Sequence, residues 1–255
     1  MNQLAPLTSR VVVIPTYDEA ATIGTALDAV LLAVPHVEVL VVDDGSPDGT
    51  ADVVRAHPAY ADQVHLLVRD RKSGLGDAYR AGFAWALRNG YDQIAQMDAD
   101  LSHPPERLPA LFAALGSADV AVGSRYVPGG GVRRWSWRRR TLSRGGNVYV
   151  RLVLGIDVHD STAGFKAFRR EALETIEVLA SEANGYAFQI ENTWQAVRHG
   201  MSVVEVPITF TDRVEGTSKM SGPIAREALS LVARWRWDEI RQVDRRTPER
   251  GHAVV

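Results

Sequence analysis

Two aspartates separated by one residue, Asp98 and Asp100, are the clearest candidates for chemistry in this chain. They occur in QMDADLSHPPE (residues 96–106), directly after an apolar run. If the chain is still extended at Asp98, both carboxylates point to one face about 6.6 Å apart, because a strand rises ~3.3 Å per residue. Such oxygen ligands suit Mg²⁺ or Mn²⁺ when substrate phosphates complete the coordination. The alternative is that both aspartates cap a helix that begins near Pro104.

A second acidic pair, Asp43 and Asp44, bears on this choice. It ends another apolar run and precedes a predicted helix at residues 50–56. Carboxylates crowded together repel one another unless a cation or donor hydroxyl groups compensate them. Two pairs therefore favour a ligand site over a helix cap. The glycines of KSGLGDAYRAG (residues 72–82) add a weak signal for an anion at a helix start.

The elements that must position these residues alternate between strands and helices. Between the apolar runs, residues such as Ile23, Leu27 and Val30 recur at helical spacing. The alternation predicts an α/β fold with an open, mostly parallel central sheet flanked by helices. Ligands bind such sheets at the carboxyl ends of the strands. The runs typical of buried strands cover residues 10–17, 37–44, 64–70, 93–98 and 119–126. The polar clusters at their ends cover residues 15–19, 43–46, 98–100 and 124–126.

The second half of the chain has a less regular pattern. Residues 127–131 are expected to form a flexible loop, and no long linker separates a second domain. We therefore predict a single catalytic domain over residues 1–241, including an amphipathic terminal helix over about 223–241, and a disordered tail over 242–255. The other expected elements are helices over 139–154 and 187–200 and strands over 163–169 and 202–210.

Composition narrows the functional classes. The 255 residues include no cysteine, which excludes disulfides and thiolate catalysis. A formal net charge of −2 argues against a protein that coats nucleic acid. No apolar run approaches the ~18 residues of a membrane span, so we expect a cytoplasmic protein.

One segment, RRWSWRRRTLSR (residues 133–144), is strongly basic and carries two tryptophans. A solvated helix does not need Trp135 and Trp137, and a nucleic-acid patch would be unusual on an acidic protein without a recognition motif. Arginines can bind anionic lipid headgroups, and tryptophans are common at the membrane interface. Their combination here favours a flap that faces a membrane. The terminal helix could also touch a membrane or pack on the core.

Seven motifs follow one another in the order IPTYDEAATI, VVDDGSPDGT, GLGDAYRAG, MDADLSHPPE, GSRY, GFKAF and EVPITFTDRVEGTSKM. Together, from about Val11 to Met220, they resemble the dolichyl- and polyprenyl-phosphate mannose synthases, inverting glycosyltransferases of family two. The resemblance implies the GT-A fold, a Rossmann-like nucleotide-diphospho-sugar transferase fold. It also implies transfer of mannose from GDP-mannose to a polyprenyl monophosphate with Mg²⁺ or Mn²⁺ as cofactor.

The resemblance assigns the donor side of the site to matching residues. Asp98, Ala99 and Asp100 would hold the nucleotide and the metal ion. Ser102 stands where some relatives have a metal-binding glutamine, so it is the third candidate ligand. The residues implied for the guanine nucleotide are Pro15, Tyr17, Glu19, Val42 and Asp44.

The resemblance also implies cations for the phosphates, namely Arg125, Arg213 and Lys219. Arg139 is our choice for the acceptor phosphate, with Arg138 and Arg140 as competitors.

No general base is assigned. Transfer to a sugar hydroxyl normally needs one, but a phosphomonoester with a second pKa near ~6 is already anionic at neutral pH. Asp98, Asp100 and Arg125 would act by stabilising the departing nucleotide electrostatically. His103 is interpreted as a structural or capping residue.

Two alternatives remain: the same fold with UDP-glucose or another donor, and a scaffold that binds a nucleotide sugar without catalysis. We expect a peripheral protein on the cytoplasmic face of the membrane. A separate membrane protein that anchors it is a further candidate partner, and no nucleic acid partner is expected.

Overall fold

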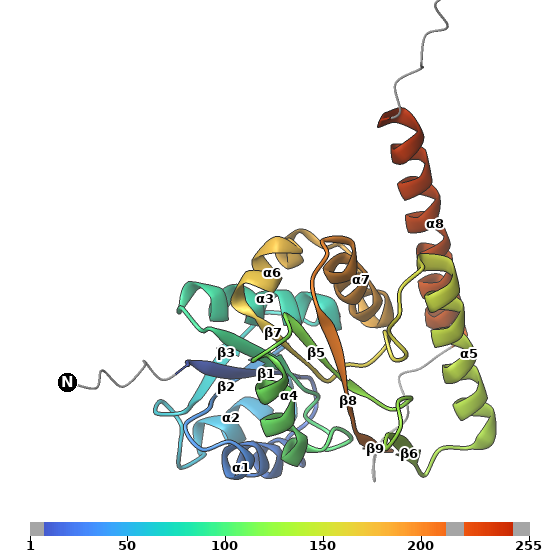
Figure 1. Ribbon diagram of the computed structural model, residues 1–255. Helices are drawn as coiled ribbons and strands as arrows, with labels where there is room; N and C mark the ends of the chain where they lie inside the picture. The colour runs from blue at the N-terminus through green and yellow to red at the C-terminus, as the bar shows by residue number, and fades with distance from the viewer. Residues whose placement is uncertain (1–7, 213–221, 247–255) are drawn as a thin grey trace, which may run out of the picture.

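The computed structural model describes residues 8–212 and 222–246, and its first half alternates strands with helices (Figure 1). The predicted strand and helix positions agree closely with those observed. These elements are β1 (Arg10–Thr16), α1 (Ile23–Ala33), β2 (Glu38–Asp43), α2 (Thr50–Arg55), β3 (Val64–Val68), α3 (Leu75–Arg88), β4 (Gln93–Gln96), the 3₁₀ turn η1 (Pro105–Arg107), α4 (Leu108–Ala114) and β5 (Val120–Ser124).

The second half completes the sheet and adds a helical layer beside it. The predicted run over residues 202–210 is divided into two strands at Ile208, because the chain leaves the main sheet there. The elements are β6 (Gly131–Arg133), α5 (Trp137–Leu154), β7 (Lys166–Arg169), α6 (Arg170–Thr175), η2 (Val178–Ala180), α7 (Gly185–Arg198), β8 (Val203–Pro207), β9 (Thr209–Thr211) and α8 (Gly222–Arg246).

The main sheet has seven strands in the order β3-β2-β1-β4-β7-β5-β8. All its neighbouring pairs are parallel except those of β7, which runs antiparallel to both β4 and β5. The carboxyl ends of β1, β2, β4 and β5 therefore meet at one edge, where the sequence places its polar clusters. A separate parallel pair joins β6 to β9.

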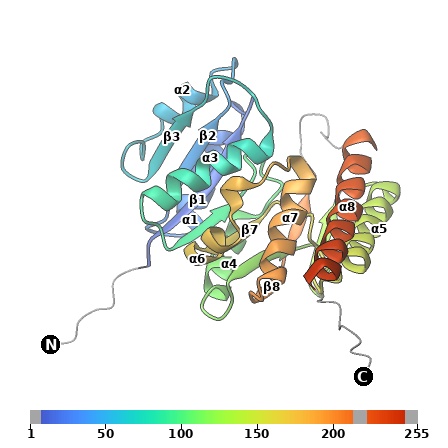
Figure 2. The same ribbon diagram turned by 90° about the horizontal axis from the view of Figure 1, so that it is seen from above.

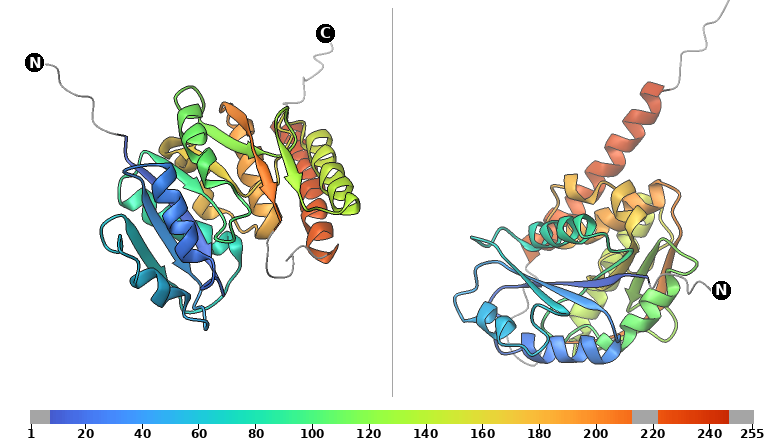
Figure 3. Two further views of the ribbon diagram at one scale, coloured as in Figure 1. Left: turned by 90° about the horizontal axis from the view of Figure 1, so that it is seen from below. Right: turned by 90° about the vertical axis from the view of Figure 1, so that its left-hand side faces the viewer.

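Helices cover both faces of the sheet, as Figure 3 shows for α1 on one side and α3 on the other. Alternate side chains of β1 serve the two faces: Val12 and Ile14 pack with Leu27 of α1, and Val13 packs with Phe83 of α3. Helix α3 lies very close to the sheet at Gly82. A Cβ at this position would lie 2.4 Å from Val13 Cγ1, so the close approach requires a glycine. This apolar burial on both faces explains why the strands have continuous apolar sequences.

A third apolar cluster joins α5, α7 and α8, which lie together at the end of the molecule opposite α2 and β3 (Figure 2). Trp194 of α7 stacks on Trp235 of α8 with ring centroids 5.5 Å apart, and Val232 is fully buried. The terminal helix thus packs on the core. It extends to Arg246, past the predicted end at residue 241, and the last residues of the predicted tail lie outside the described ranges.

Three elements were not expected from the sequence: β6, α6 and the short turn η2. The glycine-rich segment predicted as a loop leads into β6, and α6 follows directly after β7. None of the helices in the described ranges is long and apolar enough to cross a membrane.

Candidate active site

Two cavities lie side by side at the carboxyl edge of the sheet. The β1–β2 cavity, of about 150 Å³, is lined by Pro15, Tyr17 and Glu19 from the end of β1 and by Asp44 after β2. The α5 cavity, of about 230 Å³, is lined by residues of β5, α5 and the segment after β9. Asp98, Asp100 and Leu75 line both cavities, so the two aspartates stand where the cavities meet. Ala99 lines the β1–β2 cavity beside them.

A turn, not an extended strand, brings the two aspartates together. Strand β4 ends at Gln96, and Leu101 has a positive φ of 59°. The backbone N–H of Asp98 donates to His103 Nδ1 at 3.1 Å, and Asp98 Oδ1 accepts from the Tyr79 hydroxyl at 3.1 Å. The extended geometry considered from the sequence is therefore absent. The helix-cap alternative is absent too, because η1 begins without a side-chain capping bond.

Three buried side chains hold this turn. The Ser102 hydroxyl donates to Asp100 Oδ1, and the backbone N–H of Ser102 donates to the same oxygen at 3.0 Å. The His103 ring stacks on Phe165, with centroids 5.3 Å apart. Burial, with the nearby Asp98 carboxylate, raises the pKa of Tyr79 well above its ordinary value, so the phenol stays a hydrogen-bond donor. Ser102 thus supports Asp100 directly, and its part as a metal ligand stays a prediction.

The second acidic pair is compensated from within the protein. Asp43 accepts hydrogen bonds from the Thr16 hydroxyl at 2.9 Å and the Ser46 hydroxyl at 2.6 Å, which fixes the loop after β2. Asp44 forms an ion pair with Arg69 at 2.8 Å. Burial raises the pKa of Asp44, and Arg69 opposes that effect. Donor hydroxyls and an arginine therefore resolve the repulsion noted in the sequence.

Two residues change the expected composition of the β1–β2 cavity. Val42 is fully buried in the core and its side chain does not line the cavity. Lys72, which sequence reasoning missed, does line it, with Nζ 3.7 Å from the centroid of the Tyr17 ring. Its position after β3, at the start of the segment KSGLGDAYRAG, could have indicated that Lys72 lies at the ligand edge of the sheet. Within residues 8–212 and 222–246, the charged residues that line this cavity are Glu19, Asp44, Asp98, Asp100 and Lys72.

Arg125 lines the α5 cavity from the end of β5 and is almost fully buried. Its Nε and Nη2 donate to the two oxygens of Asp160 at 2.7 and 2.6 Å, and Nη2 also donates to Thr162 Oγ1 at 2.9 Å. Burial acts to lower the pKa of Arg125, but Asp160 outweighs it and the pKa lies above its ordinary value. Three of the five guanidinium N–H groups are thus engaged, and no hydrogen bond within the described ranges involves Nη1.

Of the three neighbouring arginines at the start of α5, Arg139 is the one that lines the α5 cavity. Its guanidinium pairs with Asp212 at 2.5 Å and lies 4.2 Å from the Trp135 ring centroid. Arg138 is exposed over Trp137, and Arg140 is exposed beside Val132 O. This position fits the choice of Arg139, whose role with the acceptor phosphate stays a prediction. Arg213 and Lys219 lie outside the described residues.

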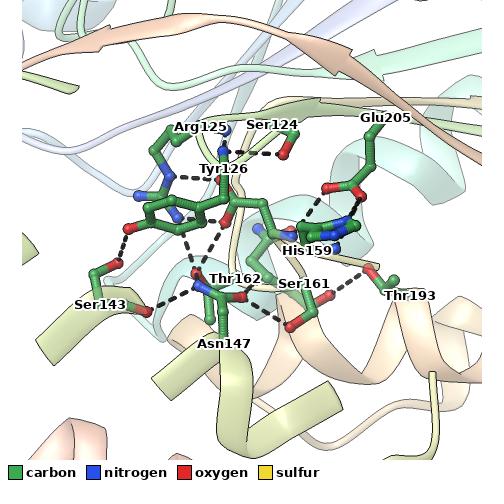
Figure 4. A network of polar contacts seen from close by, with 12 residues as sticks. Ser124, Arg125, Tyr126, Ser143, Asn147, His159, Ser161, Thr162, Thr193 and Glu205 are labelled. Carbon is green, nitrogen blue, oxygen red and sulfur yellow. Dashed lines mark hydrogen bonds and ion pairs between the residues drawn. The ribbon is translucent and has the colours of Figure 1, made fainter. Parts of the chain in front are cut away.

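A buried polar network connects the end of β5 to α5 (Figure 4). Asn147 of α5 bonds to Thr162, and Tyr126 donates to Ser143 Oγ at 2.6 Å. On the other side of the network, the Glu205 carboxylate accepts from the backbone N–H groups of His159 at 2.9 Å and Asp160 at 3.0 Å. Asp160, Thr162 and Asn147 were missed by sequence reasoning, because no local pattern marks them, whereas Arg125 was predicted.

The donor set fits a divalent cation that is shared with a substrate. Within the described ranges, no group of three or more His, Cys, Asp or Glu side chains could hold a metal ion by itself. Asp98 and Asp100 supply two hard carboxylates at the meeting point of the cavities. Mg²⁺ is commonly held by one or two carboxylates together with substrate phosphates and water. These two residues would hold such an ion.

Comparison with known proteins gives consistent matches. The family model described as glycosyl transferase family 2 matches residues 11–177. The polyprenol monophosphomannose synthase of Mycolicibacterium smegmatis is 52% identical over 235 residues, covering 90% of this chain and 88% of that protein. The undecaprenyl-phosphate mannosyltransferase of Micrococcus luteus is 47% identical over 233 residues, covering 90% of this chain and 96% of that protein.

Solved structures show a similar fold at low identity. The glucosyl-3-phosphoglycerate synthase of Mycobacterium tuberculosis, in complex with Mn²⁺, UDP and glucosyl-3-phosphoglycerate, has a TM-score of 0.66 and 20% identity. The match covers 90% of this chain and 80% of that chain. The same enzyme with phosphoglyceric acid has a TM-score of 0.67.

Proposed function

The chain belongs to glycosyl transferase family 2 and has the predicted GT-A fold, and on that basis we propose that it transfers mannose from GDP-mannose to a polyprenyl monophosphate. The names of the two relatives support the sugar and the class of acceptor. The observation that carries the proposal is the position of Asp98 and Asp100 between two cavities of different chemistry.

The two cavities suit two substrates. The β1–β2 cavity contains four of the five residues implied for the nucleotide, namely Pro15, Tyr17, Glu19 and Asp44, and the Lys72 ammonium lies over the Tyr17 ring. The α5 cavity contains Arg125 and Arg139, whose planar guanidinium groups suit a phosphate. We assign the nucleotide sugar to the first cavity and the acceptor phosphate to the second, so the sugar would lie near Asp98 and Asp100.

Charge explains why a divalent cation belongs in this arrangement. Among the described residues, the β1–β2 cavity is lined by Lys72 and by four acidic side chains, of which Asp44 is paired with Arg69, and a nucleotide diphosphate adds further negative charge. In the α5 cavity Arg125 and Arg139 already have carboxylate partners. A Mg²⁺ or Mn²⁺ ion on Asp98 and Asp100 would neutralise the diphosphate and stabilise its departure.

The reaction needs no proton transfer. A phosphate oxygen of the acceptor attacks the anomeric carbon of the sugar and forms the new carbon–oxygen bond. The bond from that carbon to the diphosphate oxygen breaks, and its electron pair leaves with GDP. Attack from the side opposite the leaving group inverts the anomeric configuration. His103 is consistent with this scheme, because its Nδ1 accepts from the Asp98 backbone and its ring is buried.

The arginines would orient the acceptor. Asp160 holds the Arg125 guanidinium by two N–H groups, and Nη1, which has no hydrogen bond within the described ranges, would be the donor available to the acceptor phosphate. Asp212 and Trp135 hold Arg139 in the same cavity. Donors that are fixed before the acceptor binds lose less rotamer entropy on binding.

We also propose that the protein binds the cytoplasmic surface of a membrane through the outer face of α5. Trp137, Val148 and Leu152 are 71%, 51% and 78% exposed, and their spacing places them on one side of the helix. Arg138 and Arg144 are exposed near this stripe. Interfacial tryptophan and arginines beside an apolar stripe suit an anionic lipid surface.

A panel of nucleotide sugars with a short-chain prenyl phosphate, with and without EDTA, tests the donor, the acceptor and the metal together. The expected result is transfer from GDP-mannose that EDTA abolishes and Mg²⁺ or Mn²⁺ restores. Preferred transfer from UDP-glucose would reject the donor assignment. Full activity in EDTA would reject the role of the cation.

A further inference from the structure

The inner face of α5 carries three polar residues at helical spacing: Arg139, Ser143 and Asn147. Steps of four residues place them in one row along the helix. Each contacts a different part of the active-site edge. Arg139 lines the α5 cavity, Ser143 accepts a hydrogen bond from Tyr126, and Asn147 bonds to Thr162 in the segment between α5 and β7, as Figure 4 shows. The row therefore joins α5 to the end of the sheet.

Asn147 uses the full bonding capacity of its amide. It is 2% exposed, and its Nδ2 donates to Thr162 Oγ1 at 3.0 Å and to the Ser143 carbonyl at 3.1 Å. Its Oδ1 accepts from the Ser161 hydroxyl at 3.1 Å and from the Thr162 N–H at 3.3 Å. Two donors and two acceptor positions are all that an asparagine amide offers. A fully satisfied buried polar group of this kind fixes one arrangement of its neighbours.

Thr162 transmits this arrangement to Arg125. Its Oγ1 accepts from Asn147 Nδ2 and from Arg125 Nη2 at 2.9 Å, so the hydroxyl proton is left for Asp160 Oδ1 at 3.3 Å. A threonine hydroxyl has one proton and two lone pairs, and all three are then used. The position of Asn147 on α5 therefore determines where Thr162 can hold the Arg125 guanidinium.

We propose that Asn147 is a positioning residue for the acceptor phosphate. Through Thr162 it keeps Arg125, which comes from β5, in fixed register with Arg139, which comes from α5, so that both arginines can bind one phosphate. This inference rests on the proposed function, because it assumes that a phosphate occupies the α5 cavity. The residue does not line that cavity and contacts no reacting atom.

Helix packing alone does not explain an asparagine here. The neighbouring inward residues Val150 and Leu154 are buried in an apolar cluster. A leucine at position 147 would extend that apolar face at higher helix propensity. The asparagine is better explained by the contacts that it makes with the segment 160–162.

The test compares Asn147→Leu, Thr162→Val and the double variant in steady-state kinetics with a short-chain prenyl phosphate. We expect each single variant to raise the acceptor KM about tenfold, the loss that corresponds to one hydrogen bond to a charged group, and to leave the GDP-mannose KM within about twofold. The double variant should resemble the single variants, because all three break the same link. Thr162→Ser keeps the hydroxyl and should restore a KM near that of the wild type.

Asn192→Leu provides a matched control. Asn192 is also 2% exposed on a helix, and none of the hydrogen bonds recorded in the described ranges involves its side chain. This variant should leave both KM values unchanged. If Asn147→Leu and Asn192→Leu give the same ratio of the two KM values, or if the double variant is additive, the proposal is overturned.

Failure of the proposed function would be visible separately, in the wild-type enzyme. If the wild type does not transfer mannose to the prenyl phosphate, the assignment of substrates fails. If the wild type transfers mannose and the variants keep its acceptor KM, only the positioning role of Asn147 fails. Calorimetric binding of the prenyl phosphate, without donor, should show the same tenfold loss in Asn147→Leu.

Discussion

Replacing Asp160 by asparagine should destabilise the whole domain. Asp160 is fully buried, and its two oxygens accept from Arg125 Nε and Nη2 and from the Arg125 backbone N–H. An asparagine keeps one oxygen but directs an N–H₂ group at another donor, and it leaves the arginine charge buried without compensation. Breaking a buried pair in this way costs ~3–5 kcal/mol.

The matched control is Asp157→Asn. Asp157 also pairs with an arginine, Arg151, at 2.6 Å, but its side chain is 87% exposed. An exposed pair contributes ~0.2–1 kcal/mol. Each kcal/mol lowers the melting temperature of a domain of this size by ~2–4 °C, so Asp160→Asn should lower it by ~6–20 °C.

Urea unfolding followed by circular dichroism measures both variants. The wild type, Asp157→Asn and Asp160→Asn should unfold in that order of decreasing stability, with most of the loss in Asp160→Asn. In the protein that remains folded, Asp160→Asn should also raise the KM for the acceptor more than the KM for the donor. Equal stability of the two variants would refute the claim that the buried Arg125–Asp160 pair organises this edge of the sheet.

Three further predictions follow from the contacts of single cations. Arg139→Ala should raise the acceptor KM about tenfold and Arg138→Ala less than twofold, because Arg139 lines the α5 cavity; equal effects would contradict this. Lys72→Ala should raise the GDP-mannose KM several-fold through loss of its contact with Tyr17, and a change confined to the acceptor KM would reject its assignment. Burial lowers the pKa of Lys166 from 10.5 to about 7, so the unfolded chain binds more protons between these values. The stability of the wild type relative to Lys166→Met should therefore rise between pH 7 and pH 10 in urea unfolding, and parallel pH profiles would contradict the shift.

Most of the sheet could be predicted because its strands are buried on both faces. Runs such as Val11–Ile14 and Val39–Val42 are wholly buried. A continuous apolar run of this kind can be identified as a strand from its own residues, without knowledge of the strand that pairs with it. Strand β6 escaped prediction because three residues in a glycine-rich segment form it by pairing with β9, a partner far along the chain. The reversed direction of β7 likewise depends on the path of the chain and not on its own residues.

In the site, too, features set by the local sequence could be predicted, and features set by contacts between distant segments could not. The position of polar clusters after β1, β2, β4 and β5 was enough to predict that Asp44, Asp98 and Asp100 lie together. The geometry of the two aspartates could not be predicted in this way, because the turn after Gln96 depends on hydrogen bonds with Tyr79 and His103.

Residues that act through a partner were missed for a related reason. Asp160 is 35 positions from Arg125, and neither residue has a periodic or motif signal that joins them. Asn147 appears in the sequence as a polar residue inside a helix, and only the position of α5 beside Thr162 explains it. Charge compensation between distant segments is set by the fold and is not visible in a single sequence.

Asp100→Asn tests the central claim most directly. The measurement is the rate of transfer of labelled mannose from GDP-mannose to a prenyl phosphate, by the wild type and the variant, over a range of Mg²⁺ or Mn²⁺ concentrations. We expect the variant to lose at least about 100-fold in rate at every metal concentration, as removal of a group that stabilises transition-state charge does, with its urea unfolding curve unchanged. Near-normal turnover in Asp100→Asn would contradict the assignment of Asp98 and Asp100 as the residues that hold the metal ion and the nucleotide.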